Sequence, residues 1–274
     1  NENVWSHYDC MTVGEMGNTT ADVAADYIIQ GHKEIDMLFH FEIGKNANLI
    51  TVLDYKTTQA RWAKLLERNA WLTQYLTNHD TARQVSRFGN DKEYRVPSAK
   101  LLATLTHTMP GTPYVYQGEE IGMTGAGNDP SKRAPMYWNA ARNNGTTQPP
   151  PECIVPEEYP FGSLQEQRGD DASVYNYYRQ AIAIRQAVPA ISHGRTVAET
   201  ALNKGCVSAF RKNWEGEECI ILMNISPEIA TVDLTQYAAW ELAAQLCTDQ
   251  EKVTLADTAL QLPAYAVAVL IPKN

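Results

Sequence analysis

The sequence predicts an α/β fold followed by a smaller all-β domain. Up to about residue 190, short apolar strands alternate with helical stretches, and the strands end in polar residues. Repeated strand–helix units of this kind form a parallel sheet with right-handed crossovers. From residue 191 onward the segments are short, strand-like and separated by Gly, Asn, Pro and Asp turns, which is typical of a small antiparallel sandwich. We therefore assign residues 1–190 to an α/β domain and 191–274 to a β domain.

The elements of the α/β domain follow from apolar periodicity. We expect a strand at 9–16, a helix around 20–29, a strand at 35–43, a helix at 57–69, a strand at 71–77, a helix at 95–109, a strand at 112–117 and a helix at 172–188. The helix at 57–69 is amphipathic, with Trp62 and Leu65 on its apolar side. Residues 122–168 are rich in Gly, Pro and Asn, and a loop of that length is usually functional or poorly ordered.

In the β domain the apolar runs are shorter and the turn residues more frequent. We expect its strands at 207–211, 219–225, 230–234, 240–246 and 264–271.

Composition excludes several classes of partner. The 274 residues are 44% hydrophobic and 20% charged, which is normal for a globular protein with a sizeable core. The net charge of −9 argues against nucleic acid or an anionic membrane as partner. No apolar run approaches the ~20 residues of a membrane helix. The five cysteines are scattered without metal-like spacing, which favours reduced thiols and a cytoplasmic location.

Polar residues stand at the ends of two of the expected strands. The strand at 71–77 leads into Asn78-His79-Asp80, and the strand at 9–16 closes with Gly14-Glu15. In parallel α/β barrels the chemistry lies at the C-terminal ends of the strands, where the following loops converge. The alternative is structural: the Asp caps the next helix, while the His and the Glu are exposed turn residues.

Several short stretches, in this order and spacing, resemble the α-amylase family of glycoside hydrolases, in particular its oligo-1,6-glucosidase and α-glucosidase branch. The stretches are MTVGEM at 11–16, NHD at 78–80, VSRFGN at 85–90, YQGEEIGM at 116–123 and RAPM at 133–136. The resemblance covers nearly the whole chain. It implies a (β/α)8 TIM barrel followed by an antiparallel β domain.

Only strands that resemble the fifth to the eighth of that barrel are present. Eight strands with their helices need about 250 residues, whereas the α/β part here ends near residue 190. The family's nucleophile, an Asp in a Gly-Phe-Arg-x-Asp motif, has no match in the sequence. We therefore expect a C-terminal portion of a longer enzyme, whose partner is the missing N-terminal half-barrel. That half is a separate chain, a part absent from this sequence, or lost.

The resemblance gives Glu15 the role of general acid/base. To stay protonated near neutrality, its pKa must be raised by burial and by neighbouring carboxylates. Asp80 resembles the family's second essential Asp, which binds sugar hydroxyls and stabilises an oxocarbenium-like transition state. His79 is expected to hold a hydroxyl of the same sugar.

Three further residues are expected to contribute to substrate binding. Arg133 matches an Arg that reaches the terminal glucose, although Ala, Tyr and Asn replace the family's Thr, Gln and Asp in the stretch that follows it. A surface ion pair is the rival interpretation of Arg133. Arg83 is expected near the substrate entrance. Phe41 either lines the pocket or fills the barrel interior.

The leading functional hypothesis is a retaining, exo-acting α-glucosidase or oligo-1,6-glucosidase that acts on short α-glucans. An endo-acting α-amylase, a neopullulanase-like enzyme or a transglycosylating relative stays open, because the loop between residues 120 and 133 is shorter than in typical oligo-1,6-glucosidases. A third class is a non-catalytic member, like the heavy subunits of amino-acid transporters, or an inert half-enzyme. We expect no cofactor in this chain, whereas calcium is possible in the missing half. Without the nucleophile, the isolated chain is expected to be inactive.

Overall fold

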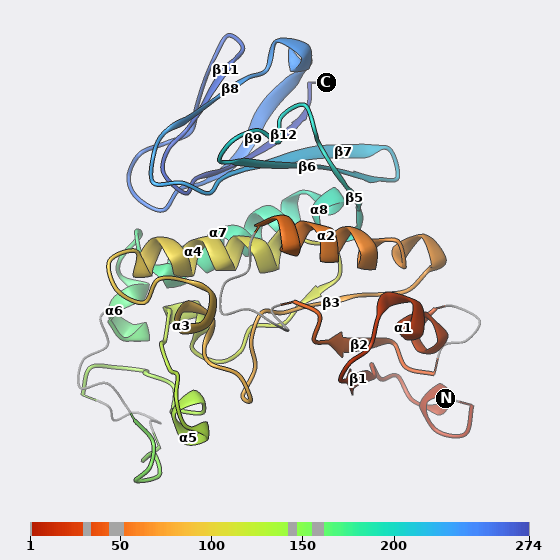
Figure 1. Ribbon diagram of the computed structural model, residues 1–274, viewed down its shortest axis with the longest axis vertical. Coiled ribbons are helices and arrows are strands. Elements are labelled where there is room, and N and C mark those ends of the chain that lie inside the picture. Colours follow the sequence, from red (N-terminus) through yellow and green to blue (C-terminus); the bar gives the residue numbers. More distant parts are fainter. Residues whose placement is uncertain (1, 30–33, 44–51, 142–146, 155–161, 274) are drawn as a thin grey trace.

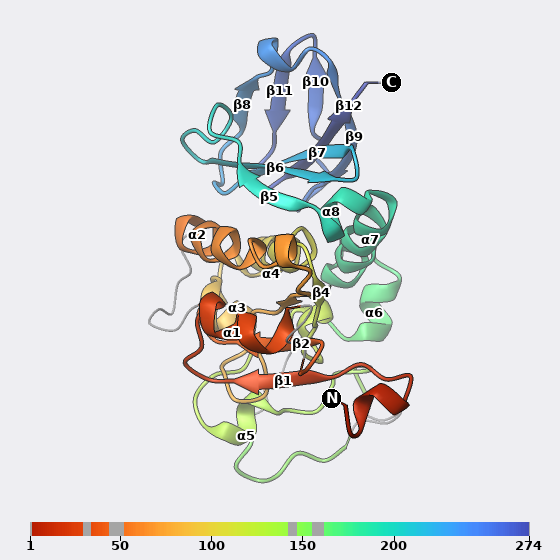
Figure 2. The ribbon, with the colours of Figure 1, turned by 90° about the vertical axis from the view of Figure 1, so that its right-hand side faces the viewer.

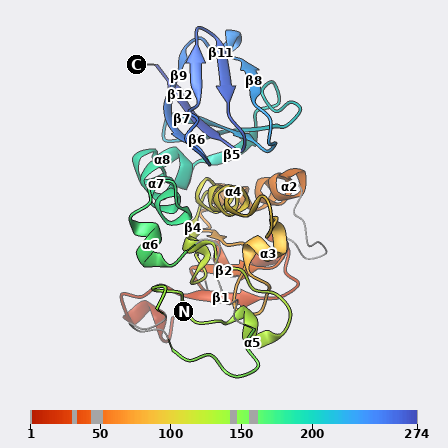
Figure 3. The same cartoon turned by 90° about the vertical axis from the view of Figure 1, so that its left-hand side faces the viewer.

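The computed structural model describes residues 2–29, 34–43, 52–141, 147–154 and 162–273. The molecule is layered, with antiparallel β sheets at one end, helices in the middle, and short parallel strands with their loops at the other end (Figure 1). Views from the two sides show the same order of layers (Figures 2 and 3). Within the described residues, no helix has the combination of length and apolarity needed to cross a bilayer.

The N-terminal part alternates strands with helices, as the sequence predicts. Its elements are η1 (Trp5–His7), β1 (Val13–Met16), α1 (Ala21–Ile28), β2 (Met37–His40), α2 (Val52–Ala63), η2 (Leu66–Arg68), β3 (Thr73–Gln74), α3 (Gln84–Phe88), α4 (Arg95–His107), β4 (Thr112–Pro113) and η3 (Glu119–Ile121). β1 pairs in parallel with β2, and β3 pairs in parallel with β4. The strand ends on which the site depends therefore point the same way within each pair.

The parallel ladders are shorter than predicted. The strand expected at 71–77 pairs with β4 only over Thr73–Gln74. Side chains join this strand to β2: Thr73 Oγ1 donates to Leu38 O at 2.7 Å, and Tyr75 Oη donates to His40 O at 2.5 Å. The residues beyond the ladder are thus placed by side-chain bonds rather than by strand pairing.

The helix expected at 57–69 is displaced. α2 runs over Val52–Ala63 and is followed by the short turn η2, after which Asn69 takes a left-handed conformation with φ of 57°. Trp62 and Leu65 are buried, as the amphipathic pattern predicts, and they pack with the apolar residues of α1.

Four helices follow in the described residues after position 122: α5 (Asp129–Lys132), α6 (Leu164–Arg168), α7 (Val174–Ala187) and α8 (Pro189–His193). α7 agrees with the helix predicted at 172–188, and Ser173 caps it by accepting a hydrogen bond from Asn176 N at 3.1 Å. α5 and α6 lie in the segment that was expected to be a loop. Residues 142–146 and 155–161 of that segment lie outside the described residues.

The C-terminal part consists of antiparallel strands, as predicted, but its strands at 195–198, 254–256 and 259–262 were not predicted. They are β5 (Arg195–Ala198), β6 (Val207–Trp214), β7 (Glu217–Asn224), β8 (Ala230–Asp233), β9 (Trp240–Leu246), β10 (Thr254–Ala256), β11 (Ala259–Leu262) and β12 (Val267–Pro272), with the turn η4 (Thr235–Tyr237) after β8. A five-stranded sheet has the order β5-β6-β7-β12-β9, and a three-stranded sheet has the order β10-β11-β8. One apolar cluster joins residues of both sheets.

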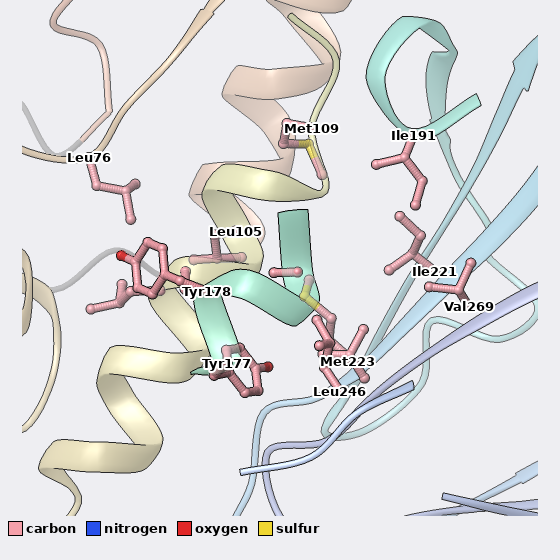
Figure 4. Packing of buried hydrophobic residues seen from close by; sticks show 14 of the residues in the cluster. Leu76, Leu105, Met109, Tyr177, Tyr178, Ile191, Ile221, Met223, Leu246 and Val269 are labelled. Atoms are coloured by element: carbon pink, nitrogen blue, oxygen red, sulfur yellow. The ribbon is translucent and has the colours of Figure 1, made fainter. Parts of the chain in front are cut away.

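A second apolar cluster joins the helices to the five-stranded sheet. Figure 4 shows Leu105 of α4 and Tyr177 of α7 on one side, with Ile221, Met223 and Val269 of the sheet on the other. The side chains of this cluster are at most 7% exposed. The sheet therefore packs directly on the helix layer that supports the parallel strands.

Arg185 of α7 fixes the segment that leads into β4. Its guanidinium donates to His107 O at 2.9 Å, to Met109 O at 2.5 Å and to Gly111 O. Gly111 has φ of 106°, and a Cβ there would lie 2.4 Å from Leu72 O, so the position requires glycine. The buried cation thus satisfies carbonyls at the end of α4 that have no helical partner.

Replacing Arg185 should destabilise the protein. R185M leaves buried carbonyls without a donor, at a cost of about 1–3 kcal/mol each, so the free energy of unfolding should fall by roughly 3 kcal/mol. Urea unfolding followed by circular dichroism measures the loss. R179M, on an exposed arginine of the same helix, is the matched control and should change stability by less than about 0.5 kcal/mol. Equal stability of the two variants would contradict the assignment.

Candidate active site

Glu15 lies on β1, opposite Phe39 of β2 in the parallel register. Its side chain is exposed. The described residues therefore do not supply the burial that we expected around this carboxyl. Within them, β1 is paired only with β2, and its other edge is unpaired. Glu15 nevertheless faces the aromatic residues of the site: burial, and then the negative charge of Glu15, raise the pKa of the Tyr75 phenol.

The residues after β3 form a compact polar turn. Asp80 N donates to Asn78 Oδ1 at 3.0 Å, and Asn78 N donates to Thr81 Oγ1 at 3.1 Å. The next helix, α3, has Arg83 as its N-cap without a side-chain capping bond. Asp80 is thus not a helix cap, and its carboxylate and the His79 ring are both exposed.

Arg133 meets this turn from the C-terminal end of α5. Its guanidinium lies 2.7 Å from Asp80 Oδ1 and 3.1 Å from Asp129 Oδ2, and its Nε donates to His79 O at 3.1 Å. His79 Nε2 lies 3.4 Å from the same Asp80 oxygen. The ion pair that rivalled a substrate role for Arg133 is therefore present, and it is made with a predicted site residue.

Two adjoining cavities bring these residues together. One, of about 220 Å³, is lined by Glu15 and His79, and the other, of about 400 Å³, is lined by Glu15 and Asp80. Phe41 and Tyr75 border both cavities. Glu15 and the polar turn after β3 thus share one face of the molecule, and Phe41 lies between them.

An aromatic wall behind Phe41 was missed in the sequence. Phe39 contacts Tyr75 and Tyr114 edge to face, with ring centroids 5.0 and 4.7 Å apart, and Phe41 contacts Tyr75 at 6.1 Å. All these rings line the smaller cavity. The signal was available, since Phe39 and Phe41 lie two positions apart in the strand predicted at 35–43, but their partners Tyr75 and Tyr114 follow β3 and β4. Aromatic faces and edges are suitable contacts for the apolar face of a sugar ring.

Arg83, expected near the substrate entrance, is buried and contacts Tyr116, which lines the smaller cavity. Its side chain is 0% exposed. The guanidinium donates to Gln117 O at 2.5 Å and to Ala134 O at 3.0 Å, and it lies over the Tyr116 ring at 5.0 Å. Gln117 and Ala134 lie outside the helices and strands, and the buried Arg83 side chain supplies hydrogen-bond donors to their carbonyls.

Glu119 is a second interior group that sequence reasoning did not assign. It is 2% exposed, it accepts from Thr77 Oγ1, and it accepts from Tyr116 N at 3.2 Å. Burial raises the pKa of Glu119 to about 8. The hydrogen bonds from Thr77 and Tyr116 lower this pKa, and the charge of Glu120 raises it further. Gly118 before it has φ of 91°, and a Cβ there would approach the Arg83 guanidinium to 2.9 Å.

The chemistry of this site is carried by carboxyl, imidazole and guanidinium groups. Among the described residues, no group of three or more His, Cys, Asp and Glu side chains is arranged to hold a metal ion. Calcium in a further part of the protein stays a prediction.

Comparison with known proteins identifies the family. The family model described as the α-amylase catalytic domain matches residues 1–194. An oligo-1,6-glucosidase of Halalkalibacterium halodurans is 30% identical over 322 residues, covering 100% of this chain and 57% of its own length. The probable oligo-1,6-glucosidase 2 of Bacillus subtilis is 36% identical, covering 68% of this chain and 41% of its own. The chain belongs to the α-amylase family of glycoside hydrolases.

Solved structures agree with this family. Eubacterium rectale Amy13B superposes with a TM-score of 0.83 at 28% identity, covering 97% of this chain and 53% of its own. The trehalulose synthase MutB of Pseudomonas mesoacidophila superposes with a TM-score of 0.85 at 26% identity, covering 99% and 57%. The chain therefore superposes on part of the fold of these α-amylase-family enzymes. The chain spans about half the length of the curated relatives that it matches.

The buried carboxyl predicts a pH-dependent stability. With a pKa of about 8 in the folded state and an ordinary value near 4.5 when unfolded, Glu119 holds its proton more tightly when folded. Its contribution is complete below pH 4.5 and is lost as the pH rises to 8, at up to about 1.4 kcal/mol per pH unit.

Urea unfolding between pH 5 and 9 measures this slope. E119Q should remove it relative to the wild type, whereas E228Q, on an exposed glutamate, is the matched control and should leave it in place. A slope that persists unchanged in E119Q would show that other groups produce the pH dependence, and would contradict its assignment to this carboxyl.

Proposed function

We propose that this chain is the acid/base-bearing part of a retaining α-glucoside hydrolase that acts on short α-glucans. The observation that carries the proposal is the convergence of Glu15 with His79 and Asp80 on adjoining cavities, in a chain of the α-amylase family. Relatives named oligo-1,6-glucosidase and trehalose-6-phosphate hydrolase support a glucoside substrate.

In this proposal Glu15 protonates the leaving-group oxygen and later takes a proton from the attacking water. Retaining hydrolysis needs a carboxylate nucleophile about 5–5.5 Å from that acid. The nucleophile is supplied by residues outside this chain, and β1 to β4 take the places of the fifth to eighth barrel strands. Burial of Glu15 then comes from the bound sugar and from the other half of the barrel.

Asp80, His79 and Arg133 bind the sugar. Both ion-pair contacts of Asp80 involve Oδ1, so Oδ2 accepts a hydrogen bond from a sugar hydroxyl. The guanidinium fixes the carboxylate, which then stabilises positive charge on the sugar ring without reorganising. Phe41 and Tyr75 supply the apolar wall between this carboxylate and Glu15.

Terminal glucose is the proposed unit of release. Relatives named α-glucosidase and oligo-1,6-glucosidase support exo action. A transglycosylating relative is the second candidate, favoured by the likeness to structures named trehalulose synthase. The alignment with the H. halodurans enzyme spans 322 residues although this chain has 274, so that relative carries residues without a counterpart here.

The isolated chain should not hydrolyse p-nitrophenyl α-glucoside, because its sequence lacks the nucleophile motif. A longer product of the same gene that supplies the nucleophile should hydrolyse it. In that longer protein, E15Q should lower kcat by about 10²–10⁴-fold through loss of the acid, whereas E34Q, on an exposed glutamate, is the matched control. Hydrolysis by the isolated chain would refute the interpretation that it is a fragment without its nucleophile. Full activity of E15Q would refute the acid/base assignment of Glu15.

The earliest products distinguish exo from endo action. We expect the longer protein to release glucose and leave a substrate one residue shorter, maltotriose from maltotetraose and isomaltose from isomaltotriose, as measured by chromatography at less than a tenth of complete conversion. Maltose from maltotetraose at the first time points would favour endo action. Rearranged disaccharides from sucrose would favour the transglycosylating candidate.

A further inference from the structure

Glu119 connects the ends of two strands inside the protein. The carboxyl accepts from Thr77 Oγ1, on the residue directly before the Asn78-His79-Asp80 turn, and from Tyr116 N at 3.2 Å, in the segment after β4. At 2% exposure it is shielded from solvent. It therefore joins the segment after β4 to Thr77, 42 positions earlier in the sequence than Glu119, without lining the cavity itself.

The neighbouring Arg83 holds the segment that carries Arg133, the ion-pair partner of Asp80. Its guanidinium donates to Ala134 O, next to Arg133, and Gln117 Nε2 donates to the same oxygen at 3.1 Å. Its positive charge acts on Glu119, lowering the pKa of that carboxyl as the weakest of the effects there. Both halves of the Asp80–Arg133 pair are thus attached to one buried polar cluster.

The adjacent Glu120 has a different role. Its Oε2 accepts from Gly118 N at 2.8 Å, which is a bond within the same turn. The two glutamates are consecutive in the sequence, but the bond to Thr77 is made by Glu119. This difference provides a matched control.

We propose that Glu119 is a positioning residue for the sugar-binding turn: through Thr77 it fixes where His79 and Asp80 stand relative to Glu15. The inference rests on the proposed function for its catalytic consequence. The turn is held internally by local bonds between Asn78, Asp80 and Thr81. Those local bonds preserve the shape of the turn. Arg133 and Lys132 contact its exposed side, and the bond from Thr77 to the buried carboxyl fixes its base in the interior.

A carboxyl is suited to this role because it bonds on both sides. One oxygen accepts from the backbone N–H of Tyr116, and the other accepts from the Thr77 hydroxyl. A glutamine has the same shape: its oxygen accepts from Tyr116 N, and its NH2 group donates to the Thr77 hydroxyl oxygen, which keeps that bond with its direction reversed. A leucine has similar volume and makes neither bond.

The first test needs only the 274-residue chain. In nitrogen-15 NMR spectra, E119L and T77V should each shift the amide resonances of Asn78, His79 and Asp80. E119Q and E120L should leave these resonances close to those of the wild type. If E119L does not fold, T77V and E119Q carry the comparison. Unchanged resonances in T77V, with a folded protein, would overturn the inference.

The second test uses the longer, hydrolytically active product of the gene. E119L should lower kcat by about 100-fold with a smaller change in KM, because misplacement by about 1 Å costs that much in rate. E119Q should recover the rate to within tenfold, E120L should stay within threefold of the wild type, and E119L/T77V should be no slower than E119L. A wild-type kcat in E119L would overturn the inference. Absence of hydrolysis by the longer wild-type protein would instead refute the proposed function, and the NMR result would still decide the positioning role.

Discussion

The structure depends on buried cations that donate to backbone carbonyls where strand ladders and helices end. The parallel ladders are short, so the segments that follow them must find hydrogen-bond donors elsewhere. Arg83 and Arg185 supply them around β4. Lys100 of α4 donates to Thr248 O in the β domain at 2.5 Å, and Lys212 of β6 donates to Ile191 O of α8 at 3.1 Å. Burial lowers the pKa of Lys212 to about 7. A cation without such carbonyls would be costly at these depths.

Two of these buried cations, Arg83 and Arg185, hold loops that lead into the candidate site. The aromatic wall and the polar turn rest on a scaffold whose charged groups are hidden, while Glu15, His79 and Asp80 face solvent. The division separates two tasks. The hidden groups place the loops, and the exposed groups are available to a sugar.

Much of the fold was predictable because periodicity reports on burial. α4 and α7 lie close to their predicted ranges, and the C-terminal strands follow the turn residues. The ends of β3 and the start of α2 were not predictable, because side-chain bonds such as that of Thr73 to Leu38 O decide them. The candidate site was predicted from its polar strand ends, and the structure places Glu15, His79 and Asp80 on adjoining cavities. The burial of Arg83 was missed because its acceptors lie 34 and 51 positions further along the chain, and nothing local distinguishes it from a surface arginine.

The shared core described above means that the β domain is not a detachable module. The apolar sides of α4 and α7 close against β7 and β12, and Lys100 crosses the same boundary to Thr248. Cutting the chain near residue 190 would place that apolar surface in water and leave the lysine without its acceptor. Domain exchange between relatives of this family would therefore have to carry the matching helix faces along with the β sheets.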